Sequence, residues 1–135
     1  MHQFQVRTSS RTELKDITAQ VTDAVSEMGI DNGVVTLFIP HTTAAVTINE
    51  NADPDVVHDM LKVIDEIIPF NHPAYRHMEG NSAAHIKSSL VGCSQSVIVE
   101  NGCLQLGTWQ GIYFAEFDGP RTRKVWVKAG DGDNG

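Results

Sequence analysis

The stretch that decides the fold spans residues 33–68 and reads GVVTLFIPHTTAAVTINENADPDVVHDMLKVIDEII. The β-branched apolar run VVTLFI has the length and composition of a strand, Pro40 ends it, and AAVTI resumes it. Asp53 followed by Pro54 marks the start of a helix, because Asp offers a side-chain acceptor at the N-cap and Pro has no amide proton to leave unpaired. Strand and helix signals therefore follow one another closely.

Behind Pro54 the apolar residues recur at helical spacing, which predicts one buried helix face. That face is expected to carry Val57, Met60, Leu61, Ile64, Ile67 and Ile68. The charged residues Asp55, Asp59, Lys62 and Asp65 are expected on the solvent side. Most of the acidic charge in this part of the chain is then a solvated helix surface.

The flanking segments continue the mixture of strands and helices. Further strands are predicted at 3–7, 14–17, 97–99, 104–106, 112–117 and 125–127, and further helices at 18–28, with Thr18 as N-cap, and at 82–90, closed by Gly92. DGPR at 118–121 is interpreted as a hairpin turn. The prediction is an α+β fold: one compact domain of antiparallel sheet with about three helices over 1–130, then a flexible acidic tail at 131–135.

Composition narrows the class of protein. The 135 residues include 10 Lys and Arg against 17 Asp and Glu, a formal net charge of -7. No broad basic face is available to grip a phosphate backbone, so nucleic-acid binding is not expected. No long apolar run or secretory signal occurs, and Cys93 and Cys103, which are interpreted as small apolar residues, form no disulfide framework. We expect a cytoplasmic protein without a membrane partner.

His41 is the first candidate for chemistry, because it follows Pro40 at a break in strand pairing, where a side chain can reach a cleft. Thr42 and Thr43 add hydroxyl groups suited to phosphate or carboxylate oxygens. Asn49 and Glu50 add an amide and a carboxylate at the far end of the returning strand. The alternative is a strand-end histidine that bonds to backbone.

The second candidate is HPAYRHMEGNSAAHIKSSL at residues 72–90. Neutral imidazoles with an open position for water suit a catalytic divalent ion such as zinc, and this stretch supplies His77 and His85. His41 would have to arrive from elsewhere in the chain. The alternative is a set of scattered structural histidines.

The third candidate is GTWQGIYFAEFDGPR at residues 107–121. Gly107 suggests that the backbone passes close to a ligand or another chain, and Trp109 and Gln110 would present an aromatic face and an amide. The tryptophan could equally be core. Glu116 and Asp118 with Arg121 could brace the hairpin as an ion pair, or form a carboxylate and an anion clamp.

Three stretches together resemble the YjbQ family: PHTTAAVTINEN, HMEGNSAAHIKSSL and SQSVIVENGCLQLGTWQGIYFAEFDGPR. The resemblance runs over nearly the whole chain. It implies an α+β homotrimer with a histidine-lined site near the subunit interfaces. It also implies a low, secondary thiamine phosphate synthase activity, which joins hydroxymethylpyrimidine diphosphate to thiazole phosphate and releases diphosphate.

By position, the resemblance places the family's histidines, as metal ligands, at His41, His77 and His85. It places the acid and amide at Glu50 and Asn49, and the GTWQ element at Gly107 to Gln110. A divalent ion with Lys87 or Arg121 would neutralise the leaving diphosphate, and Trp109 would stack on the pyrimidine. The chain departs from the family at Asn81, Ser82 and Ala83, where many members carry acidic residues and a proline, so a carboxylate is missing there.

The physiological substrate is expected to be another small phosphorylated molecule. The alternative is a non-catalytic trimer that binds a small molecule or a partner in the same pocket.

Overall fold

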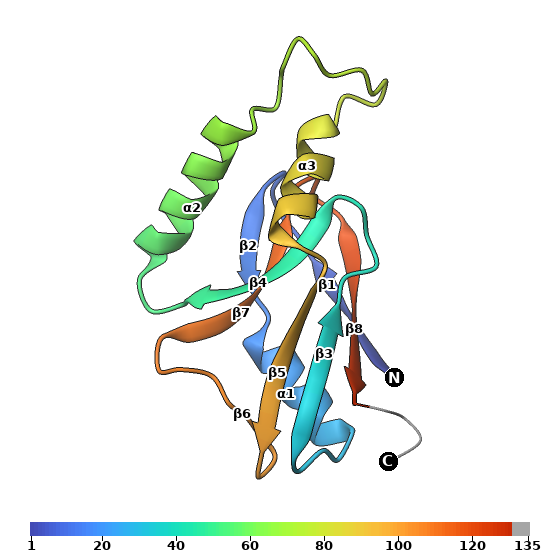
Figure 1. Cartoon of the computed structure of the whole chain (residues 1–135), viewed down its shortest axis with the longest axis vertical. Helices are drawn as coiled ribbons and strands as arrows, with labels where there is room; N and C mark the ends of the chain where they lie inside the picture. Colours follow the sequence, from blue (N-terminus) through green and yellow to red (C-terminus); the bar gives the residue numbers. More distant parts are fainter. Residues whose placement is uncertain (131–135) are drawn as a thin grey trace.

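The computed structural model describes residues 1–130, which form two antiparallel sheets and three helices (Figure 1). The elements in chain order are β1 (His2–Arg7), β2 (Glu13–Asp16), α1 (Thr18–Glu27), β3 (Gly33–Phe38), β4 (Ala44–Glu50), α2 (Pro54–Ile67), α3 (Ser82–Val91), β5 (Ser94–Glu100), β6 (Cys103–Leu104), β7 (Gln110–Glu116) and β8 (Thr122–Ala129). The predicted α+β class is confirmed. The tail predicted at 131–135 lies outside the described residues.

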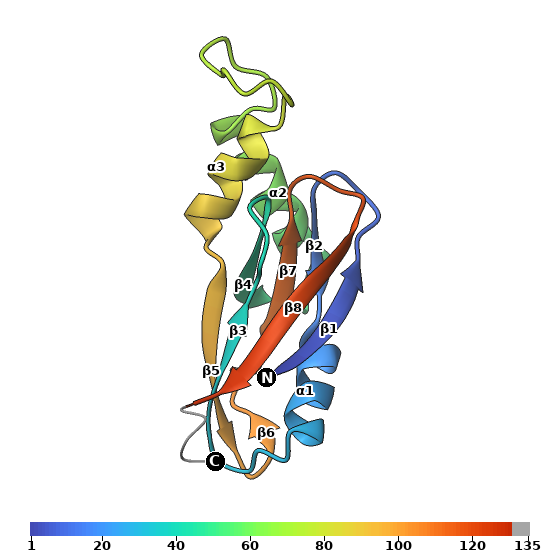
Figure 2. The same ribbon diagram turned by 90° about the vertical axis from the view of Figure 1, so that its right-hand side faces the viewer.

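The strands divide into a five-stranded sheet in the order β1-β8-β3-β5-β6 and a three-stranded sheet in the order β2-β7-β4 (Figure 2). β3 and β4, which the sequence suggests to be one interrupted strand, lie in different sheets. The segment 39–43 therefore carries the chain from one layer to the other, and it brings His41 to this crossing.

The prediction of a hairpin turn at 118–121 was wrong. β7 is already paired on both edges, with β2 and β4, while β8 lies between β1 and β3. The DGPR segment consequently passes between the sheets, as the 39–43 segment does. Both crossings lie at the same end of the molecule, because Phe117 N–H donates to Thr43 O at 3.2 Å.

The core fills the space between the two sheets and α1. Alternate residues of β3 and β8 point into it, as do Val46 of β4 and Phe114 of β7. Val21 and Val25 of α1 close one side. A second, smaller cluster joins the opposite face of the three-stranded sheet to α3 through Ala45, Ala84, Ala115 and Phe117.

The caps of α1 and α3 differ in how well the sequence predicted them. Thr18 is the first helical residue of α1 rather than its N-cap, and Asp16 Oδ1 accepts its backbone N–H at 2.9 Å. α3 ends before Gly92 as predicted, and Gly92 has a φ of +100°, which favours glycine.

α2 lies at the periphery of the three-stranded sheet (Figure 1). It begins as predicted, with Asp53 Oδ1 accepting the Asp55 N–H at 2.9 Å and Pro54 in the first turn. None of its residues is buried, and Ile67, expected on a buried face, is 70% exposed. The apolar stripe is real, but this chain covers it only in part. None of the described helices is long and apolar enough to cross a membrane.

Candidate functional site

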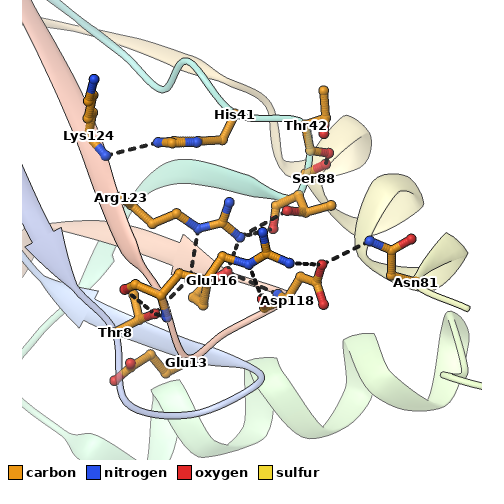
Figure 3. Close-up of polar contacts among 12 residues, drawn as sticks. Thr8, Glu13, His41, Thr42, Asn81, Ser88, Glu116, Asp118, Arg123 and Lys124 are labelled. Atoms are coloured by element: carbon orange, nitrogen blue, oxygen red, sulfur yellow. Dashed lines mark hydrogen bonds and ion pairs between the residues drawn. The ribbon is translucent and has the colours of Figure 1, made fainter. Parts of the chain in front are cut away.

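His41 lies at the crossing between β3 and β4, where its Nε2 accepts the backbone N–H of Lys124 at 2.9 Å (Figure 3). An acceptor Nε2 places the proton of the neutral ring on Nδ1. Burial, and then the positive charge of Arg123, lower the pKa of His41 below its ordinary value of 6.5. The ring is therefore neutral at pH 7, with Nδ1–H as its remaining donor.

A buried ion pair lies beside His41. Arg123 Nε donates to Glu116 Oε1 at 2.8 Å, and its Nη2 bonds to Glu116 Oε2. The same Nη2 donates to Thr43 Oγ1 at 2.9 Å, so the hydroxyl of Thr43 is engaged by Arg123 rather than facing a cleft. Glu116 is 0% exposed and Arg123 is 3% exposed. This pair joins the ends of β4, β7 and β8.

Burial raises the pKa of Glu116, but hydrogen bonds from Arg123, the Asp118 N–H and Thr8 outweigh it, so the net shift is downward from 4.5. Of the two carboxylates that could pair with Arg121, Asp118 does so, at 2.8 Å, whereas Glu116 pairs with Arg123. Strand alternation contained the missed signal. Glu116 shares a face with Ile112 and Phe114, which places its carboxylate on the core side of β7.

A cavity of about 450 Å³ brings His41 and His85 together. Its other lining residues come from the crossing, from α3 and from the segment after it: Thr42, Ala44, Ser88, Ser89, Gly92 and Cys93. The hydroxyls of Ser88 and Ser89 donate to backbone carbonyls. Cys93 is exposed here, contrary to its interpretation as a small apolar residue.

His77 approaches the site from the loop before α3. Its ring meets the ring of His85 edge-to-face, with centroids 5.4 Å apart, in an adjoining cavity of about 510 Å³. His85 therefore lines both cavities, and the three predicted histidines do gather at one side of α3.

The fit to a metal ion is incomplete. Across residues 1–130 no three His, Cys, Asp or Glu side chains stand close enough to hold one ion. The Nε2 of His41 is already bonded to Lys124 N–H. Of the predicted ligands, only His77 and His85 meet directly.

The predicted residues Asn49, Glu50, Trp109 and Gln110 lie at the far end of β4. A strand of seven residues separates its ends by about 20 Å. Trp109 is 63% exposed and so is not core. The Gln110 side chain accepts the Gly107 N–H at 2.7 Å, so what approaches Gly107 is this chain's own amide. Within one chain, this group is separate from His41.

Lys87 and Arg121 do not line the histidine cavity either. Lys87 is 3% exposed, and its Nζ donates to Asp65 of α2 at 2.7 Å. Asp65, expected to face only solvent, thus connects α2 to α3. Lys87 lines a third cavity, of about 380 Å³, on another face of α3.

Fold and site together define a class: a single-domain α+β protein of two antiparallel sheets, with histidines gathered where the chain crosses between the layers. The chain belongs to the family described as UPF0047 protein YjbQ-like, whose sequence pattern matches residues 2–131. The resemblance to the YjbQ family is thereby confirmed.

The similarity extends over nearly the full length of the relatives. The chain is 60% identical to UPF0047 protein YugU of Bacillus subtilis, covering 93% of this chain and 95% of that one. It is 53% identical to a UPF0047 protein of Methanocaldococcus jannaschii, covering 95% and 92%. A crystal structure of an uncharacterized YjbQ/UPF0047 family protein from Clostridium acetobutylicum superposes with a TM-score of 0.92 at 55% identity, over 96% of this chain and 99% of that one.

Proposed function

We propose that the protein is a homotrimer that binds a small phosphorylated molecule in the cavity between His41 and His85, and that a low thiamine phosphate synthase activity is a secondary property of this cavity. The observation that carries the proposal is that two imidazoles and the Thr42 hydroxyl share one cavity. His41 offers Nδ1–H there, because its Nε2 is occupied. Neutral donors of this kind suit phosphate oxygens.

The assembly is supported by the uncovered apolar surface of α2. Val63 is 49% exposed and Ile67 is 70% exposed on a helix with no buried residue. Large apolar side chains in a row on one face are typical of an interface. A neighbouring copy in the homotrimer that the resemblance implies would cover them.

A secondary rather than a principal synthase activity fits the positions of the cations. Loss of diphosphate requires positive charge at the leaving group. Lys87 is paired with Asp65, Arg121 with Asp118, and neither lines the histidine cavity. Glu50 and Trp109 would reach that cavity only from another subunit. The same observations favour the second candidate, a trimer that binds its ligand without turnover.

A divalent metal such as zinc is part of the proposal at His77 and His85, whose rings are in contact. Two imidazoles fill only part of a zinc coordination shell, so further ligands would come from water, the bound molecule or another subunit. Metal analysis of the purified protein tests this point. A divalent ion that is present in the parent protein and absent from His77→Ala supports the metal site. Metal-free protein that binds its ligand fully refutes the metal site.

The main experiment measures binding of hydroxymethylpyrimidine diphosphate and thiazole phosphate by calorimetry, and their conversion to thiamine phosphate. His85→Ala should abolish both. His58→Ala is the matched control, because His58 is exposed on α2 and, among residues 1–130, its side chain bonds to Asp59 alone. Binding without turnover in the parent protein would favour the second candidate, and undiminished binding in His85→Ala would refute the histidine cavity as the site.

Sedimentation tests the assembly. The expected mass is three times the chain mass of 14.8 kDa. Val63→Lys should shift the protein toward monomer, while Glu66→Lys, at an already charged position of α2, should not. A monomeric parent would contradict the trimer.

A further inference from the structure

The cavity between α2 and α3 contains polar groups that the histidine site does not use. Its lining comes from the β1–β2 loop, α2, the 69–81 loop, α3 and the segment just after β7. Four of these residues carry the argument: Arg11, Asp65, Asn81 and Lys87. The cavity, of about 380 Å³, is large enough for a small anion with part of a larger molecule attached.

Lys87 is the buried cation of this cavity. Its side chain is 4% exposed, whereas that of its partner Asp65 is 60% exposed. A buried ammonium has three donors, and Asp65 takes one of them at 2.7 Å. Because Asp65 is on the peripheral helix and mostly in solvent, its carboxylate can be replaced by another anion at little cost in packing.

Arg11 supplies a second positive charge. Its guanidinium lies 4.0 Å from the centre of the Phe70 ring, and both residues line the cavity. Throughout the part of the chain that the structure describes, no carboxylate pairs with Arg11 and its side chain donates no hydrogen bond. The ring therefore positions a cation that has no anionic partner.

Asn81 favours a ligand that can donate a hydrogen bond. Its Nδ2 donates to Asp118 Oδ2 at 2.9 Å, while its Oδ1 is buried and has no hydrogen-bond partner among residues 1–130. A buried acceptor without a partner is destabilising, so a ligand that donates to it is favoured. The ligand must therefore accept from two cations and also donate one hydrogen bond.

We propose that this cavity binds a protonated phosphate group, which displaces Asp65 from Lys87, takes Arg11 as a second cation and donates its hydroxyl to Asn81 Oδ1. Inorganic phosphate near pH 7 still carries at least one O–H, and a phosphate monoester carries one as its monoanion. Sulfate, with the same shape, carries none, so it satisfies the cations but not Asn81. The site is separate from the histidine cavity and does not depend on the proposed function.

The test is calorimetric titration with inorganic phosphate and with sulfate at pH 7, on the parent protein and in a His41→Ala background that disables the histidine cavity. Phosphate should bind at least about tenfold more tightly than sulfate in both, as expected for one satisfied buried acceptor. Equal affinities for the two ions, or loss of phosphate binding in His41→Ala, would overturn the proposal.

Two substitutions in the cavity should change phosphate affinity in opposite directions. Arg11→Gln, at an exposed position, should weaken phosphate binding about tenfold, while Asp65→Asn should strengthen it, because the competing carboxylate is removed. A purely structural role for the Lys87–Asp65 pair would predict no gain in Asp65→Asn, and that result would refute the exchange. Glycerol 3-phosphate and inorganic phosphate, titrated in parallel at about pH 5.5, where the monoester keeps one O–H, distinguish a phosphate that belongs to a larger molecule from a free phosphate ion.

Discussion

Removing Arg123 should reverse the sign of the contribution that Glu116 makes to the pH dependence of stability. In the native protein the pKa of Glu116 is lowered, so the stability that this carboxylate contributes is present above its unfolded value of 4.5 and is lost as the pH falls through the lower, folded value. In Arg123→Met the carboxylate stays buried without its cation. Burial then dominates, so the pKa of Glu116 rises above 4.5. The stability that Glu116 contributes is then lost as the pH increases through this raised pKa.

The size of the effect follows from the contacts. Arg123 makes two bonds to Glu116 and one to the Thr43 hydroxyl, in a site where Glu116 is 0% exposed. Breaking one side of such a buried pair costs about 3–5 kcal/mol. For a domain of this size, that corresponds to a decrease in Tm of about 10–18 °C at pH 7. The decrease should be smaller at pH 5, where protonation of Glu116 relieves the buried charge.

Urea denaturation of the parent and of Arg123→Met between about pH 3 and pH 7 measures both slopes, because the parent slope lies below pH 4.5 and the variant slope above it. The double variant Arg123→Met with Glu116→Gln is the control, because it removes both charges and should recover part of the loss at pH 7. Parallel pH profiles in the parent and the single variant, or no recovery in the double variant, would show that Glu116 is not held ionised by Arg123.

Three further outcomes are expected. NMR titration of His41 should give a pKa below 6.5, and Arg123→Met should raise it, since the positive charge of Arg123 disfavours the imidazolium; an unchanged value would contradict their proximity. Because the folded pKa of His41 is lowered, its contribution to stability should be complete above pH 6.5 and decrease as the pH falls below it, a slope that His41→Gln should remove from the denaturation profile. Asp53→Ala should cost about 1 kcal/mol in urea denaturation through loss of the N-cap of α2, and Asp53→Asn should cost much less.

Local signals in the sequence were sufficient for most of the secondary structure. Asp53 and Pro54 start α2 where the sequence placed it, because a cap depends only on residues within one turn. The prediction of Thr18 as N-cap of α1 was wrong: Ile17 holds the N-cap position without a side-chain cap bond, and Thr18 N–H donates to Asp16 Oδ1. The apolar periodicity of α2 was also predicted, but its burial was not, because periodicity identifies a face and not what covers it.

The sequence identified residues of the candidate site but not how they are grouped in space. The three histidines were identified by residue type, and the structure brings His85 next to both His41 and His77. The sequence could not separate them from Glu50 and Trp109, because distance along a strand translates into distance in space only once the sheet is known. Nor could it show that Lys87 faces a different cavity from His85, although they are only two residues apart on α3.

The amino-acid sequence by itself determined the α+β class, the helix boundaries at Pro54 and Gly92, and the family, since each rests on short-range spacing or on motif identity. Only the tertiary structure decided that the chain crosses between two sheets at His41 and again after Glu116. That crossing places Glu116 and Arg123 together in the core and fixes the imidazole of His41 against the backbone of Lys124. The physical reason is that strand pairing is settled by long-range hydrogen bonds and burial, which no local pattern specifies.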